Sequence, residues 1–275
     1  MKLGIDIGGT NLCLGRVEGG ILTDKLSAPS FPADASMEET LSYLSDKIYR
    51  IITPSVESIG VGVPSVLDVE KGIVYDAANI PSWKEVHLKD YLEDKFSIPV
   101  AVNNDANCYA LGAYSSFPTN DKPEILVGIT LGTGVGLGIV EKGALFLGAN
   151  CGAGELGCLA YKDSTVEDYC SKKFFQDKAW NPQEASLAAM EGNETAISLW
   201  EEFGLNMGEL ICAVMYAYDP SHIAIGGGLA NAYPLFSPTM GRFIRDNFPY
   251  RNALSRLSIR QMTGDDILIV GAAML

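Results

Sequence analysis

The chain has 275 residues, of which 47% are hydrophobic and 20% are charged. This length suits one large domain or two of ordinary size, and the composition supports a substantial core and excludes wholesale disorder. The net charge of −14 argues against nucleic acid as a main partner, because phosphate backbones need Lys and Arg. An anionic nucleotide stays possible, since backbone N–H groups and a metal ion can hold one.

We expect a cytoplasmic protein with no membrane partner. The sequence has no run of about 18 uninterrupted apolar residues, the length that spans a bilayer, and Asp6 falls where a signal peptide would be apolar. The six cysteines are scattered without a Cys-x-x-Cys pair, which in a cytosolic chain favours reduced thiols over a disulfide framework. They are Cys13, Cys108, Cys151, Cys158, Cys170 and Cys212.

The first half begins with an antiparallel β-meander of three strands, predicted at 2–7, 12–17 and 21–27 and joined by glycine turns. A helix at 36–52 follows, because its apolar residues recur at spacings of three and four and so form one core face. These apolar residues are Leu41, Leu44, Ile48 and Ile51. The later elements of this half are a strand at 58–63, a helix near 88–95, a strand at 99–102 and a helix at 106–115.

The second half repeats the opening pattern. Residues 116–123 are polar and rich in turn formers, which indicates a hinge between two domains. After it, a strand, a Gly-Thr turn, a strand, a glycine turn and a strand recur over 124–146, and we interpret this as an internal duplication. The later elements are predicted as a helix at 194–218, a strand at 222–225, a helix at 238–246, a strand at 257–260 and a helix at 267–275.

A carboxylate at a strand-to-helix turn is the main catalytic candidate. The strand at 99–102 leads into Asn104 and Asp105, and the helix starts directly after them. Such a position can aim a general base into a cleft. The plainer alternative is that Asn104 or Asp105 only caps the helix, since both residue types are preferred there. Taken alone, the turn favours the cap, and the other motifs reverse that preference.

Two Gly-Thr turns, Gly8-Gly9-Thr10 and Gly132-Thr133-Gly134, occupy the same place in the two halves. Each offers backbone N–H groups and one hydroxyl, so the pair could hold the phosphates of a nucleotide. Ordinary hairpin chemistry explains either turn alone, and the duplication favours the paired interpretation. Asp6, just before the first turn, could orient Mg²⁺ or its water, although a lone acid near a turn is more often structural.

Other loops offer groups that suit a nucleoside and a polyol. Gly226-Gly227-Gly228 follows a strand and would allow close approach to adenine or ribose, but the chain has no Gly-Lys dipeptide and hence no Walker A loop. Several acids and amides next to loops could converge on a sugar, although each alone is a weak indication because exposed Glu and Asn are common in loops. They are Asn79, Asn104, Glu155 and Glu167.

Taken together, these motifs resemble the ROK family of sugar kinases, within the actin-like ATPase superfamily. The resemblance covers nearly the whole chain and rests on motifs in matching order at 6–11, 60–64, 104–107, 131–136, 152–157 and 219–228. It implies an α/β fold of two actin-like (ribonuclease H-like) domains, each a five-stranded mixed sheet flanked by helices, with an interdomain cleft. The implied domains are 1–116 and 117–264, and the helix at 265–275 would pack back on the first.

The resemblance also implies ATP- and Mg²⁺-dependent phosphorylation of a hexose or hexosamine, at the 6-hydroxyl, with Asp105 as the general base. Phosphoryl transfer asks mainly for positioning and charge neutralisation, which this set of residues can supply. The implied sugar-binding residues are Asn79, Asn104, Glu155, Cys158 and Glu167. The implied ATP-binding residues are Asp6, Gly8, Gly9, Thr10, Asn11, Gly132, Thr133, Gly134, Gly227 and Gly228. The family also suggests a homodimer.

The chain departs from the family pattern after Gly157. Family members have His at the next position, followed by a cysteine-rich zinc loop, whereas here Cys158 takes the place of the His and the loop is missing. Zinc is therefore not expected, because the spacing of Cys151, Cys158 and Cys170 matches no common zinc pattern. The departure also motivates an alternative, a non-catalytic sugar- or nucleotide-binding sensor of the same fold. A third interpretation is an actin-like ATPase that acts on a partner protein or a carboxylate.

Overall fold

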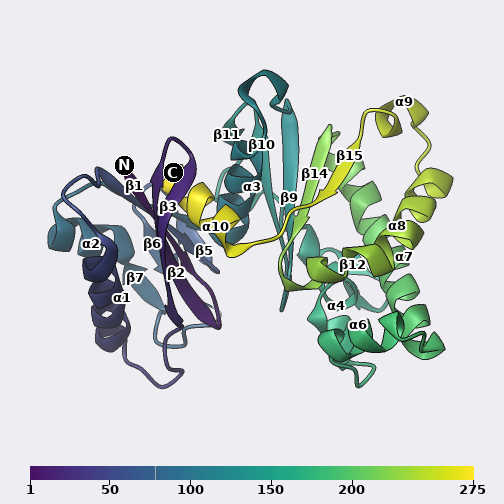
Figure 1. Ribbon diagram of the computed structural model, residues 1–275, viewed down its shortest axis with the longest axis horizontal. Helices are drawn as coiled ribbons and strands as arrows, with labels where there is room; N and C mark the ends of the chain where they lie inside the picture. Colours follow the sequence, from purple (N-terminus) through teal and green to yellow (C-terminus); the bar gives the residue numbers. More distant parts are fainter. Residues whose placement is uncertain (78) are drawn as a thin grey trace. The chain divides into compact units, whose positions relative to one another are not determined.

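The computed structural model describes residues 1–77 and 79–275, and all of their side chains except that of Asp265. The chain divides into two compact units, whose elements are labelled in Figure 1. Unit 1 comprises Met1–Lys122, Leu145–Ala153 and Gly264–Leu275, and unit 2 comprises Pro123–Ala144 and Gly154–Thr263. The domain boundaries at 116 and 264 stay a prediction. With those boundaries the segment Leu145–Ala153 would lie in the second domain, whereas in the structure it belongs to unit 1.

The main sheet of unit 1 has five strands in the order β3-β2-β1-β4-β8. The central strand β1 (Lys2–Ile7) pairs antiparallel with β2 (Asn11–Glu18) and parallel with β4 (Ser58–Val63). The edge strands are β3 (Ile21–Pro29), antiparallel to β2, and β8 (Val100–Asn104), parallel to β4. This is the five-stranded mixed sheet that the family resemblance implies.

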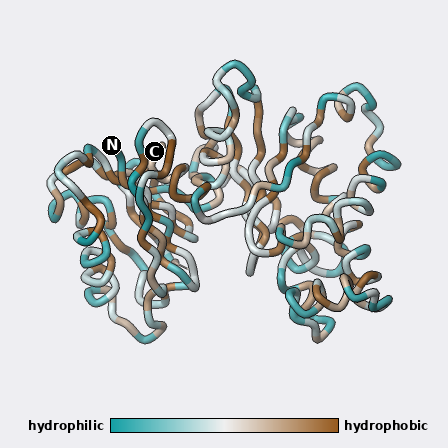
Figure 2. Tube along the Cα trace, in the orientation of Figure 1, coloured by the Kyte–Doolittle hydropathy of each residue, from teal (hydrophilic) through white to brown (hydrophobic). Residues whose placement is uncertain are grey.

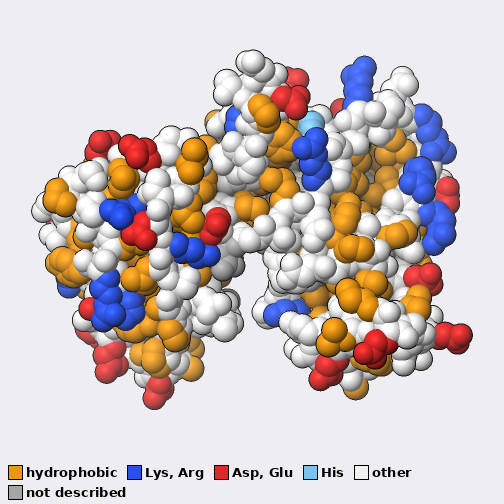
Figure 3. Space-filling model, viewed as in Figure 1, with side chains coloured by type: hydrophobic (Ala, Val, Ile, Leu, Met, Phe, Trp, Pro, Cys, Tyr) orange, Lys and Arg blue, Asp and Glu red, His pale blue; other side chains and the backbone are white. Residues whose placement is uncertain are grey.

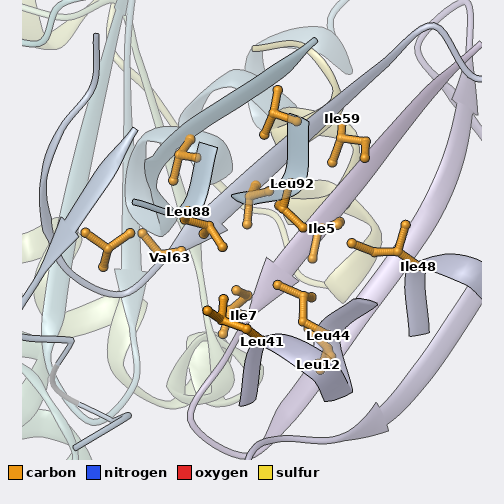
Figure 4. Packing of buried hydrophobic residues seen from close by; sticks show 14 of the residues in the cluster. Ile5, Ile7, Leu12, Leu41, Leu44, Ile48, Ile59, Val63, Leu88 and Leu92 are labelled. Carbon is orange, nitrogen blue, oxygen red and sulfur yellow. The ribbon is translucent and has the colours of Figure 1, made fainter. Parts of the chain in front are cut away.

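One face of this sheet is covered by α1 (Met37–Ile51) and α2 (Leu88–Phe96). A capping box starts α1, because the Ser36 hydroxyl accepts the Glu39 N–H at 3.2 Å and the Glu39 carboxylate accepts the Ser36 N–H at 2.8 Å. The core between helices and sheet is apolar and buried, as Figure 4 shows. Its labelled members are Ile5, Ile7, Leu12, Leu41, Leu44, Ile48, Ile59, Val63, Leu88 and Leu92.

The other face of the sheet carries glycines, and α10 (Asp265–Ala273) lies against them beside α3 (Asp105–Ser115). Because side chains alternate along a strand, Leu3, Ile5 and Ile7 join the first core, and Gly4 points to the opposite face. A Cβ at Gly4 would collide with the carbonyl oxygen of Ile269. The predicted terminal helix therefore belongs to unit 1. It begins at residue 265, the start implied by the family resemblance and two residues before the start in the chain-order prediction, and it ends at Ala273.

A small antiparallel sheet of unit 1 was not anticipated. It consists of β5 (Val66–Asp68), β6 (Ile73–Tyr75) and β7 (Glu85–His87), in that order. Each strand has three residues, which is too short for an alternating pattern to be recognised. The sequence analysis predicts no element between the strand at 58–63 and the helix near 88–95.

The sheet of unit 2 repeats the topology of the first, in the order β11-β10-β9-β14-β15. The strand β9 (Ile125–Leu131) pairs antiparallel with β10 (Val135–Glu141) and parallel with β14 (His222–Gly226). The edges are β11 (Ala144–Leu145) and β15 (Ser258–Gln261). The duplicated pattern and the α/β fold class with two five-stranded mixed sheets are confirmed.

Unit 2 is built around its longest helix, α7 (Glu194–Tyr218), whose bounds match the prediction. The helix predicted at 238–246 is α8 (Tyr233–Asn247), which starts five residues earlier because Pro238 lies inside the helix and does not open it. Buried aromatic rings join α7 and α8 to the short helix α5 (Lys172–Gln176), namely Phe174, Phe175, Trp200, Phe203 and Phe236. Figure 2 shows the hydrophobic stretches along the inner strands and the hydrophilic ones at outer turns.

The remaining elements of unit 2 are short. The described ones are a two-stranded sheet, four α-helices and two 3-10 helices: β12 (Ala160–Tyr161), β13 (Ser164–Thr165), α4 (Val166–Cys170), α5 (Lys172–Gln176), α6 (Pro182–Met190), α9 (Arg251–Leu254), η2 (Leu156–Cys158) and η3 (Gly228–Ala232). Across the described ranges, no helix combines the length and the apolar character that crossing a membrane requires.

The net negative charge is spread unevenly. Figure 3 shows Lys and Arg side chains gathered over α8 and α9 of unit 2. The stretch 242–260 contains a single acid, Asp246, and five exposed arginines, which are Arg242, Arg245, Arg251, Arg256 and Arg260. The exclusion of nucleic acid, which rested on total charge, therefore stays a prediction for this surface.

Candidate functional site

Asp105 lies at the junction of β8 and α3, with no loop between strand and helix. Asn104 is the N-cap of α3, since its Oδ1 accepts the N–H of Ala106 at 2.9 Å, and its Nδ2 donates to the carbonyl oxygen of Ser65 at 3.4 Å. Asp105 is half-buried, and its Oδ1 accepts the same Ala106 N–H at 2.8 Å. Because Asn104 already caps the helix, capping alone does not require an acid at position 105.

Behind this junction lies a small amide network that the sequence analysis missed. The buried Asn103 accepts three hydrogen bonds at Oδ1: from the N–H of Asn104 at 2.8 Å, from Nδ2 of Asn107 at 3.0 Å and from the thiol of Cys151 at 3.6 Å. Asn103 is the fourth residue of β8 and Asn107 lies in the first turn of α3, so their contact depends on the direct junction of strand and helix. The contribution of Cys151 depends on a contact across 48 residues of chain.

The two acids of unit 1 that were singled out lie near a common thiol. Burial, followed by the negative charges of Asp105 and Asp6, raises the pKa of Cys108 well above its usual range. The end of β1 lies near the β8–α3 junction, because Asp6 is opposite Gly62 of β4 and Gly62 is opposite Asn103 of β8. Two carboxylates of unit 1 therefore lie at the same end of the sheet, and carboxylate oxygen is a ligand that Mg²⁺ prefers.

The first Gly-Thr turn is fixed by hydrogen bonds to its backbone, and three of its residues are exposed to solvent. The Gly8 N–H donates to the carbonyl of Asn11 at 2.9 Å, and the Ser30 hydroxyl donates to the carbonyl of Gly8 at 2.6 Å. Gly9, Thr10 and Asn11 are exposed. A Cβ at Gly9 would lie 3.0 Å from Nδ2 of Asn79. The structure thus brings Asn79, a predicted sugar-binding residue, beside a predicted phosphate-binding turn.

The second Gly-Thr turn meets the Gly226–Gly228 segment within unit 2. The Gly132 N–H donates to the Gly134 carbonyl at 3.0 Å, and β9 and β14 run parallel with Gly226 opposite Thr130. Gly227 has a φ of +83°, and a Cβ there would collide with the backbone of Leu131, so only glycine fits. Two glycine segments that lie far apart in the sequence therefore end side by side. A Cβ at Gly132 or Gly228 would meet nothing within 4 Å, which leaves their backbones accessible.

Glu155, Cys158 and Glu167 gather at another place in unit 2. The Cys158 thiol lies 3.9 Å from Oε2 of Glu155. Partial burial, followed by the charges of Glu155 and Glu167, raises the pKa of Cys158 and keeps the thiol protonated. Glu167 in turn pairs with Lys173 at 2.7 Å, a residue that the sequence analysis did not consider. The structure therefore assembles two acids and a neutral thiol, which can accept or donate hydrogen bonds to hydroxyl groups.

Metal-binding groups are few in the part of the chain that the structure describes. There, no three His, Cys, Asp or Glu side chains are arranged to hold a metal ion. The six cysteines are thiols. The expectation that zinc is not bound stays a prediction.

The comparisons with known proteins identify the class. The ROK family model matches residues 2–275, so the chain belongs to the ROK family, as its motifs predicted. A glucokinase from Halalkalibacterium halodurans is 28% identical over 269 residues, covering 84% of this chain and 81% of the relative. An N-acetyl-D-glucosamine kinase from Aliivibrio fischeri is 28% identical over 264 residues, covering 84% and 85%.

A solved structure agrees with the fold. The ROK family glucokinase from Streptomyces griseus, in complex with glucose and AMPPNP, superposes with a TM-score of 0.78 at 25% identity and covers 99% of this chain and 98% of its own. The chain thus matches a sugar kinase along almost its whole length.

Proposed function

We propose that the protein is an ATP-dependent sugar kinase that phosphorylates a hexose or hexosamine at its 6-hydroxyl. The observation that carries this proposal is Asp105, a half-buried carboxylate directly at the β8–α3 junction, in a chain whose two units each present an open glycine turn. The names of the relatives, glucokinase and N-acetyl-D-glucosamine kinase, support the reaction and the class of substrate.

Asp105 is the general base in the proposed reaction. Its carboxylate takes the proton of the sugar hydroxyl, the hydroxyl oxygen attacks the γ-phosphorus, and the bond from that phosphorus to the ADP oxygen breaks. Asn104, held by Ser65 and Ala106, orients the sugar beside the base. The network of Asn103, Asn107 and Cys151 keeps the junction rigid, so that the carboxylate needs little reorganisation.

The glycine turns bind the nucleotide. In this proposal two turns surround the phosphates, namely Gly8, Gly9, Thr10 and Asn11, and Gly132, Thr133 and Gly134. The N–H groups of Gly8 and Gly132 close the turns, and the other backbone and hydroxyl groups of the turns face the phosphates. Gly227 and Gly228 take the adenosine. Magnesium bound with ATP supplies charge neutralisation at the phosphates. Asp6 offers the hard oxygen ligand that this ion prefers, at the end of β1 beside the first turn.

Glu155, Cys158 and Glu167, together with Asn79 and Asn104, bind the sugar in this proposal. A carboxylate accepts hydrogen bonds from vicinal hydroxyls, whereas a neutral thiol is a weak partner for them. The sugar is therefore held mainly by the two glutamates. A homodimer and a cytoplasmic location stay predictions.

The direct test is ADP production from ATP and Mg²⁺ against a panel of free hexoses and hexosamines. We expect ADP release that depends on one sugar or a small group of sugars, with a background reading in the absence of sugar. Silence across the panel, with sugar binding still detectable by thermal shift, would favour the non-catalytic sensor. ATP hydrolysis that no sugar stimulates would favour an ATPase of another kind.

A further inference from the structure

Glu167, a predicted sugar-binding residue, also contacts the residue that follows the Gly132–Gly134 turn. It lies in the first turn of α4, and its Oε2 accepts the backbone N–H of Val135 at 3.1 Å. Its Oε1 receives the ammonium group of Lys173, in α5, at 2.7 Å. One carboxylate thus links a lysine to the residue that follows the Gly132–Gly134 turn.

The packing at Gly134 shows how closely this carboxylate is seated. A Cβ at Gly134 would collide with Oε2 of Glu167, so the carboxylate occupies the space that any other residue would need. On the other side of the turn, the backbone N–H of Lys172 donates to the carbonyl of Gly132 at 3.0 Å. Segment 167–173 therefore holds both ends of the turn.

Lys173 has a second anchor that fixes its position. Its ammonium group lies 3.3 Å from Oδ1 of Asp168, and Oδ2 of Asp168 accepts the Thr165 hydroxyl at 2.8 Å. Asp168 is thus locked by the capping box of α4. A lysine tied to this fixed acid can hold the longer and more flexible Glu167 in one rotamer. It also offsets a negative charge that would otherwise lie beside the turn unpaired.

We propose that Lys173 is a positioning residue, which keeps the Glu167 carboxylate on the Val135 N–H and thereby fixes the Gly132–Gly134 turn for nucleotide phosphates. This inference rests on the proposed function, which assigns that turn to ATP. Glu167 then acts on both substrates, because each of its oxygens keeps a second lone pair that can accept a sugar hydroxyl. Lys173 touches neither the sugar nor the reacting atoms.

The test uses Lys173→Met and Lys173→Arg in the full chain. In Lys173→Met we expect the Kd of ATP·Mg²⁺, measured by calorimetry without sugar, to rise about tenfold, the scale of one charge-assisted hydrogen bond lost at a partly exposed site. We expect amide hydrogen exchange at Val135 to speed up by a similar factor. Lys173→Arg keeps the charge and the donors, and it should restore both values.

Lys178→Met is the matched control, because Lys178 forms a comparable ion pair with Glu202 at 3.5 Å, and among the described residues no hydrogen bond or ion pair joins it to Glu167. It should leave both readouts at parent values. If Lys173→Met behaves like this control, the inference is wrong, even where the parent phosphorylates sugars. If the parent phosphorylates no sugar while Lys173→Met alone changes nucleotide binding and Val135 exchange, the proposed function fails and the positioning role stands.

Discussion

Asp105→Asn is expected to lower kcat for sugar phosphorylation by roughly 10²–10⁴, the usual contribution of a general base. The amide cannot take the proton of the attacking hydroxyl, whereas its size and its hydrogen-bonding oxygen are kept. Sugar and nucleotide affinities should therefore stay near those of the parent. The measurement is ADP release at saturating substrates, together with sugar binding by calorimetry.

This substitution also separates catalysis from helix capping. Asn104 is the N-cap of α3 and is unchanged, and the new amide oxygen can still accept the Ala106 N–H. The variant loses the favourable interaction of a negative charge with the helix N-terminus, about 0.3–1 kcal/mol. A large fall in turnover with a small change in thermal stability thus indicates a base.

Asp90→Asn provides the control. Asp90 also lies in the first turn of a helix, α2, and its side chain is 67% exposed. The charge change at the helix terminus is the same, and we expect parent turnover. Equal turnover in Asp105→Asn and the parent would remove Asp105 from the mechanism and return it to a structural role.

The elements with regular apolar patterns could be predicted from the sequence. The three-to-four spacing in α1 corresponds to its buried face, and β1 and β4 are short apolar runs that the fold buries on both faces along most of their length. The three-residue strands β5, β6 and β7 carry no comparable signal, and their pairing depends on tertiary contacts. The start of α8 was missed because Pro238 is tolerated inside that helix.

The local geometry of the candidate site could be predicted where one short motif forms it, and not where distant segments meet. The strand-to-helix junction at Asp105 and the glycine turns are local, so the sequence indicates them. The contacts of Cys151 with Asn103 and of Glu167 with Val135 join residues 48 and 32 positions apart. Nothing in the local sequence of Lys173 distinguishes it from a solvated surface lysine, and only the fold shows that it pairs with Glu167.

The role of the glycines in the strands could not be predicted from the sequence either. Gly4 and Gly60 alternate with buried aliphatic residues, and glycine inside a strand normally weakens the prediction of that strand. In the structure these glycines let α10 pack directly on the sheet, since a Cβ at Gly60 would collide with the carbonyl of Ala272. Glycine at these positions lets the backbones of the sheet and α10 lie close together. The sequence alone does not show this, because the position of α10 is known only from the fold.

The same close approach makes Gly112→Ala the largest expected effect on stability. Gly112 lies in α3, and a Cβ there would collide with the carbonyl oxygen of Ile267 in α10. Neither backbone can move without disturbing the packing of the glycine face. We expect the free energy of unfolding to fall by about 3 kcal/mol, the upper part of the range for overpacked cores, as measured by denaturant titration.

Gly241→Ala is the matched control, because it makes the same change inside another helix, α8. A Cβ at Gly241 meets only Nη1 of Arg245 within 4 Å, at 3.3 Å, the far end of a flexible side chain. Alanine is about 1 kcal/mol more favourable than glycine in a helix interior, so this variant should be slightly more stable than the parent.

Hydrogen exchange measured separately for units 1 and 2 shows which unit each substitution destabilises or stabilises. Opposite signs for the two variants would show that α10 is held by contact between backbones, and equal mild effects would show that α3 and α10 can separate at little cost.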